Sequence, residues 1–160
     1  MLADKLITTL EKLLSLHEQL YKVALQKSEI LKKDLIDELR EILKQEQKLV
    51  QAIKQIEAER ILITAEYLNR EQELTLRACI DQADGLAKER LQTIHHEFQS
   101  IMDKLKAVNQ LNQQLTQQSL QFVSISLDML MPQENAQNYN RPDQSKGTAT
   151  NRRSIFDSKA

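Results

Sequence analysis

Apolar residues recur every three or four positions in the first part of the chain, from Leu2 to about Ser28. This repeat is that of one face of an α-helix, and His17 occupies one turn of it. The pattern therefore predicts a first amphipathic helix. Its apolar stripe consists of Leu6, Leu10, Leu13, Leu20 and Ala24.

A second repeat of the same kind begins near Asp34 and predicts a second helix. Asp34 and Asp37 resemble a capping pair, because carboxylates accept the free amide protons of a first helical turn and favour its dipole. The short connection over 28–34 makes the two helices antiparallel neighbours. The charged residues Glu46 and Arg60 lie within the apolar stripe of this helix and make it narrower. A narrow stripe predicts packing against a single partner face, as in a coiled coil. The apolar stripe comprises Leu35, Leu39, Ile42, Leu49, Ile53, Ile56, Ile63 and Tyr67.

The pattern loosens between the second helix and the next long repeat. Residues 69–73 are polar, residues 74–80 supply about two apolar turns, and Asp84-Gly85 ends them. We read a loop, one short helix and a stop. Because so short a helix is marginal alone, we expect it to pack over one end of the bundle. The packing residues would be Leu76, Cys79 and Ile80.

A third long helix is predicted from about Leu86 to Met131, just before Pro132. At about 1.5 Å per residue it spans on the order of 65 Å, which indicates an elongated molecule. The predicted fold is therefore all-α: an elongated antiparallel helical bundle or coiled coil of three long helices with one short helix. The seam of the third long helix comprises Leu91, Ile94, Phe98, Ile101, Leu105 and Val108, and the same frame continues as Asn112, Leu115, Ser119, Phe122, Ser126 and Met129.

After Pro132 the sequence is polar and has few apolar residues. Such a segment buries too little surface to offset its chain entropy. The expected organisation is a helical domain over 1–131 and a disordered tail over 132–160. Ile155-Phe156 leaves open a short docking peptide within that tail.

Composition and charge exclude several classes of protein. The chain has 2 Gly, 2 Pro and no Trp, and 22 Lys+Arg balance 23 Asp+Glu for a formal net charge of −1. No basic face or group of stacking aromatics suits nucleic acid. No apolar run approaches the roughly 18 to 20 residues that cross a bilayer, and the N-terminal segment lacks the pattern of a signal peptide. We therefore expect a cytoplasmic protein without membrane insertion or nucleic-acid binding.

The sequence offers little for catalysis or for a metal ion. His95 and His96 are adjacent, so on a helix they point about 100° apart and cannot chelate one ion together. Cys79 is the single cysteine, and on a short apolar helix it suits packing better than nucleophilic attack. There is no phosphate-binding loop or nucleophile elbow. We predict no enzyme activity, no cofactor and no metal.

One segment stands out as a candidate partner-binding surface, residues 110–131. It is nearly uncharged in a chain that is 28% charged. A helix that is apolar on two sides either is buried on both or offers one side to another protein. Two alternatives stay open: both stripes are core, or the β-branched part at 122–127 is a strand or is unfolded alone. The two stripes are Leu120, Val123, Leu127 and Leu130 on one side, and Phe122, Ile125 and Met129 on the other.

The helix order and the stretches 108–115 and 120–123 resemble the FlgN family of flagellar export chaperones, its Bacillus members in particular. The likeness extends over most of the chain. It includes Leu16-His17-Glu18, Ala78-Cys79-Ile80, Gln121-Phe122, Asp128-Met129-Leu130 and the terminal Phe156-Asp157-Ser158-Lys159-Ala160.

This resemblance implies a cytosolic chaperone that binds the hook-associated junction proteins. It would prevent their premature polymerisation and deliver them to the type III export apparatus, whose components are potential further partners. Asparagines in such an interface fix register at some loss of affinity. The partner-binding residues that the resemblance implies are Asn109, Leu111, Asn112, Leu115, Leu120, Phe122, Val123, Leu127 and Leu130.

Two other functions compete with this reading. One is a structural coiled-coil protein whose last helix pairs with its own copy in a homodimer. The other is a different helical secretion adaptor, such as a chaperone of the filament cap or of flagellin. The sequence also leaves open which junction protein is preferred, whether the free protein self-associates, and whether the last helix is ordered before a partner binds.

Overall fold

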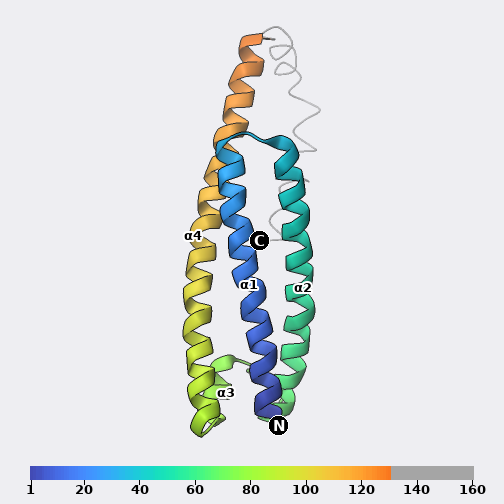
Figure 1. Cartoon of the computed structure of the whole chain (residues 1–160), viewed down its shortest axis with the longest axis vertical. Coiled ribbons are helices and arrows are strands. Elements are labelled where there is room, and N and C mark those ends of the chain that lie inside the picture. The colour runs from blue at the N-terminus through green and yellow to red at the C-terminus, as the bar shows by residue number, and fades with distance from the viewer. Residues whose placement is uncertain (131–160) are drawn as a thin grey trace, which may run out of the picture. The chain divides into compact units, whose positions relative to one another are not determined.

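The computed structural model describes residues 1–130, with the side chains of Phe122 and Val123 excepted. These residues form four helices and no strand, which confirms the predicted all-α helical bundle (Figure 1). The helices are α1 (Leu2–Lys32), α2 (Ile36–Leu68), α3 (Leu76–Gln82) and α4 (Gly85–Leu130).

The chain divides into two compact units, residues 1–116 and residues 117–160. In the second unit the described part, up to Leu130, is helical. The expected tail at 132–160, with Ile155-Phe156, lies outside the described residues. The division into a domain 1–131 and a tail 132–160 therefore stays a prediction.

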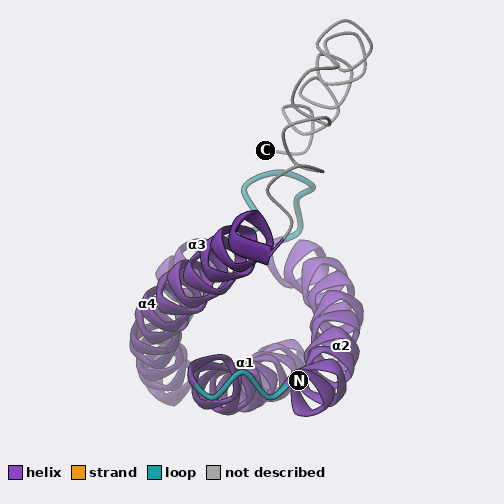
Figure 2. Cartoon of the chain, turned by 90° about the horizontal axis from the view of Figure 1, so that it is seen from above, coloured by secondary structure: helices purple, strands orange, loops and turns teal. Residues whose placement is uncertain are grey.

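Within residues 1–116, α1 and α2 are antiparallel, and α4 runs in the same direction as α1. Arg90 of α4 pairs with Glu11 near the start of α1, with the two charged groups 2.7 Å apart. Further along both helices, Asn112 of α4 meets Ser28 of α1. Viewed along the bundle, the three long helices lie at the corners of a triangle (Figure 2).

The larger cluster of buried residues lies where α3 covers one end of this bundle. Cys79 of α3 is buried there among residues of all three long helices, as the sequence predicts. The short helix is fixed at its start by Thr75, whose hydroxyl accepts a hydrogen bond from the Ala78 amide at 3.1 Å. The buried side chains around Cys79 are Leu6, Leu10, Ile63, Leu68, Ala83, Leu91 and Ile94.

The predicted seam of α4 is confirmed. Its residues from Leu91 to Val108 are buried, except Phe98, which is partly buried. The ring of Phe98 meets His17 of α1 edge to face, with ring centres 5.6 Å apart. Thus His17 belongs to the packed stripe of α1, and its Nδ1 lies 2.7 Å from the Leu13 carbonyl oxygen.

Both charged positions in the stripe of α2 have partners. Glu46 pairs with Lys27 of α1 at 3.0 Å. Arg60 forms two hydrogen bonds with the carboxylate of Glu57 and donates another to the Leu74 carbonyl at 3.0 Å. Because Leu74 precedes α3, Arg60 ties the connection between α2 and α3 to α2.

The predicted role of Asp34 as the cap of the second helix is wrong. Asp34 has a φ of 53°, and the cap of α2 is Leu35, which makes no side-chain cap bond. The Asp34 amide donates to the Leu31 carbonyl, and the Leu35 amide donates to the Ile30 carbonyl. These two bonds form the left-handed turn that ends a helix, so Asp34 closes α1 instead of opening α2.

The buried thiol predicts a loss of stability in alkali. Burial raises the pKa of Cys79 above its ordinary value of 9.0, and the nearby Arg60 opposes this only in part. Above pH 9 the unfolded thiol loses its proton while the folded thiol keeps it, so the free energy of unfolding falls as pH rises. Urea titrations from pH 8 to pH 10 should show this fall. The slope should be shallower for Cys79→Ala, and an equal slope in both proteins would assign the effect to other groups.

Candidate partner-binding surface

Leucines of the predicted surface are exposed on the last turns of α4. Leu120 is 65% exposed, Leu127 is 48% exposed and Leu130 is 79% exposed. Ile125 and Met129, which are not among the contacts that the resemblance implies, are exposed as well. The signal for both was in the sequence, because they belong to the second apolar stripe of this segment. Five bulky apolar side chains therefore face solvent within three turns of one helix.

Four polar residues of this segment share one side of the helix, whereas Gln118, Ser119 and Ser126 lie among the apolar residues on the other side. At roughly 100° per residue, the apolar residues occupy more than half of the circumference, and the polar side takes the remainder. A stripe that packs on one neighbouring helix needs an arc of only about 100°. A partner that covers these apolar residues must therefore approach from more than one direction. The polar side consists of Gln117, Gln121, Ser124 and Asp128.

Charge contributes little to this surface. Between Lys106 and Leu130 the sequence carries one charged residue, Asp128. Recognition there must rest on apolar contact and on the amides and hydroxyls of glutamine, asparagine and serine. Such a surface suits a protein helix and offers nothing to an anionic ligand.

Four predicted contacts that precede Gln117 in α4 differ in their surroundings. Asn109 and Leu111 are exposed, and Leu115 is partly buried. Asn112 is only 4% exposed, and its side-chain amide donates to the Ala24 carbonyl at 3.0 Å. In this conformation Asn112 is a packing residue of the bundle, so a partner reaches it only if α4 separates from α1.

The predicted contacts Phe122 and Val123 lie in α4, but their side chains are outside the described part. Their role in partner binding stays a prediction. The other predicted contacts also stay predictions, because the exposure of a side chain does not identify the partner that covers it.

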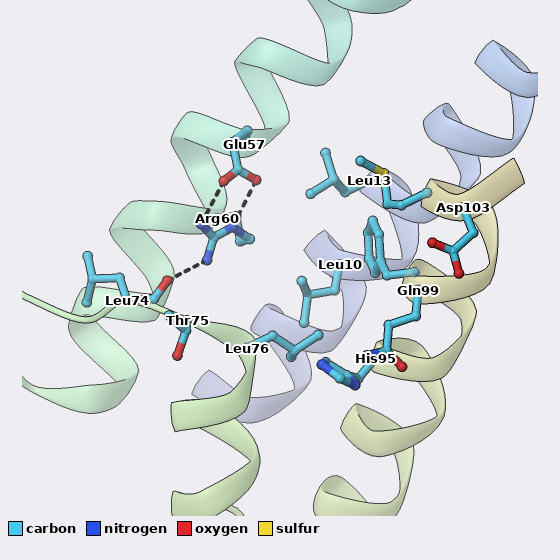
Figure 3. A pocket seen from close by; sticks show the side chains of 12 residues that line it. Leu10, Leu13, Glu57, Arg60, Leu74, Thr75, Leu76, His95, Gln99 and Asp103 are labelled. Carbon is cyan, nitrogen blue, oxygen red and sulfur yellow. Dashed lines mark hydrogen bonds and ion pairs between the residues drawn. The ribbon is translucent and has the colours of Figure 1, made fainter. Parts of the chain in front are cut away.

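A separate, concave feature lies within residues 1–116, at the end of the bundle that α3 covers (Figure 3). It is an open groove of about 770 Å³. In Figure 3, Glu57 and Arg60 stand on the α2 wall, while His95 and Asp103 stand on the α4 wall. The groove offers an apolar floor without a nucleophile held next to a base. Its apolar lining consists of Leu10, Leu13, Leu74, Leu76, Phe98 and Met102.

The described residues provide no metal centre. Residues 1–130 contain no group of three or more His, Cys, Asp or Glu side chains that could hold a metal ion. The rings of His95 and His96 lie 6.5 Å apart and meet edge to face. Within the same range, no helix is both long and apolar enough to cross a membrane.

A protein-family model and a related protein match this chain. The family model described as FlgN protein matches residues 1–147. The chain belongs to the FlgN family. It is also 40% identical, over 160 residues that cover all of both chains, to the "Uncharacterized protein YvyG" of Bacillus subtilis (strain 168). No solved structure matches the chain.

Membership of the FlgN family confirms the resemblance and sets the general function. FlgN proteins are flagellar export chaperones, a class of binding proteins and not of enzymes. The end of α4 exposes apolar side chains in this FlgN chain.

Proposed function

We propose that this FlgN chain binds the hook-associated junction proteins in the cytoplasm through the last turns of α4. It keeps their terminal helices from polymerising early and delivers them to the type III export apparatus. The observation that carries the proposal is the set of exposed apolar side chains in a chain of the FlgN family. These side chains are Leu120, Ile125, Leu127, Met129 and Leu130.

The width of the apolar arc supports a helical partner. A client whose terminal helices otherwise pair with copies of themselves offers an apolar face of the same kind. Covering that face removes the client from self-assembly by mass action, in proportion to the concentration and affinity of the chaperone. An interface without salt bridges, interrupted by Ser119 and Ser126, favours exchange over permanent association.

The test is binding of the purified full-length chain to each hook-associated junction protein, with flagellin and the filament-cap protein as comparison clients. Light scattering after size exclusion gives the mass of each complex. We expect a complex with at least one junction protein and none with the comparison clients. A homodimer that ignores every client would instead favour a structural coiled coil. A complex with flagellin or the cap protein alone would indicate a different secretion adaptor.

A further inference from the structure

A polar layer interrupts the apolar seam between α1 and α4. Asn112 of α4 and Ser28 of α1 are each 4% exposed. The Asn112 amide nitrogen donates to the Ala24 carbonyl at 3.0 Å, and the Ser28 hydroxyl is hydrogen-bonded to the Asn112 side-chain oxygen. The same hydroxyl lies 3.1 Å from the Ala24 carbonyl oxygen, so its one proton has two acceptors within reach.

The position of this layer in α4 is informative. Asn112 is the last buried residue of α4 among those whose side chains are described. On one side of it lie the apolar layers of Leu105 and Val108, both buried. On the other side, after Thr116, the exposed apolar surface begins. The layer therefore separates the packed part of α4 from the part that is available to a partner.

A polar layer opens more easily than an apolar one. When two helices part, an amide and a hydroxyl exchange their mutual hydrogen bonds for hydrogen bonds with water, at small net cost. Leu105 and Val108 regain nothing from water when they separate from α1. If α4 separates from α1 beginning at the Lys32 end of α1, the separation should therefore extend past Asn112 and end at Val108.

Opening of this layer uncovers apolar surface on both helices. On α1, Ala24, whose carbonyl accepts a hydrogen bond from Asn112, is buried in the closed form. On α4, Leu115 is partly buried, and it leads along the helix toward the exposed residues after Thr116. The uncovered surface is thus continuous in sequence with the proposed partner-binding surface.

We propose that Ser28 and Asn112 form a latch over a covered extension of the partner-binding surface. The extension comprises Ala24 and Leu115, and its occupant is an amphipathic helix of the client that enters when α4 separates from α1. The identity of this occupant rests on the proposed function, whereas the latch is a property of the free chain.

The test of the latch is hydrogen exchange of the full-length free chain, comparing wild type with Asn112→Leu. Leucine fills the layer with an apolar side chain, and Ser28 keeps the Ala24 carbonyl as acceptor, so the closed form gains stability. We expect amides of 108–116 to exchange at least about tenfold more slowly, with those near Leu91 unchanged. Ser100→Leu, which also places leucine at a polar position of α4 but at an exposed one outside the proposed surface, is the matched control.

Ser28→Ala provides an independent variant of opposite sign. It removes a hydrogen-bond partner of Asn112 while keeping a helix-forming residue in α1, so exchange over 108–116 should become faster. The latch is wrong if Asn112→Leu and Ser100→Leu behave alike. It is equally wrong if these amides are as protected in the wild type as those near Leu91.

Affinity for a junction protein separates the latch from the covered surface. If the client binds only the open form, a tenfold loss of open chains weakens its binding about tenfold. Asn112→Leu should show that loss, and Ser100→Leu should not. Unchanged affinity in Asn112→Leu would overturn the covered surface and leave the proposed function standing. Absence of binding even by the wild-type chain would overturn both, while hydrogen exchange would still decide the latch.

Discussion

Leu127→Glu is expected to weaken binding of a junction protein at least about a hundredfold, equivalent to roughly 2.7 kcal/mol. Leu127 is 48% exposed on α4, among the apolar side chains that the proposed client covers. A carboxylate there would have to be buried against an apolar face without a partner, which is costly. Isothermal titration calorimetry with the full-length variant measures the loss.

The control is Gln121→Glu, which adds the same charge on the polar side of the same helix. We expect little change in affinity for this variant, because the client need not cover that side. Circular dichroism should show unchanged helicity for both variants. If both lose binding equally, the charge of the segment decides binding and the apolar face does not. If Leu127→Glu loses helicity, Leu127 is a residue of the core.

Leu91→Ala should lower the free energy of unfolding by about 2–5 kcal/mol, the cost of removing a fully buried leucine side chain. Leu91 is 0% exposed and packs where α3 closes the bundle. The alanine leaves a cavity that surrounding helices fill only in part. Urea unfolding followed by circular dichroism gives the change, provided that the dependence on urea concentration stays the same.

Leu86→Ala is the matched control on the same helix. Leu86 is 84% exposed, so its truncation should change the free energy of unfolding by less than about 0.5 kcal/mol. Equal effects of the two substitutions would mean that helix propensity, and not burial, determines the result. A small effect for Leu91→Ala would contradict the core described around α3.

The spacing of apolar residues was sufficient to predict the helices and most of their seams. Leu91, Ile94 and Leu105 recur at helical spacing, and a helix buries such a stripe wherever a neighbour offers a complementary one. The short helix around Cys79 was predictable for the same reason. Periodicity determines which face of a helix is apolar, and this information is local.

The features that the sequence did not predict depend on contacts or on backbone geometry. Asp34 suits the start of a helix by residue type, but its left-handed backbone places it at the end of α1. Asn112 was predicted as a partner contact from the resemblance to the FlgN family. Its burial depends on small residues of α1, Ala24 and Ser28, far away in sequence. No periodicity within α4 reveals them.

The scarcity of charge at the end of α4 has a kinetic consequence. Electrostatic steering raises association rates well above the 10⁵–10⁶ M⁻¹ s⁻¹ typical of neutral surfaces, and Asp128 alone offers almost no field for it. Encounter with a client at this surface is therefore unsteered and nearly insensitive to ionic strength. Fast binding of the client then requires a high concentration of the chaperone or synthesis of both proteins close together. The lifetime of the complex is set by the rate at which the apolar contacts separate.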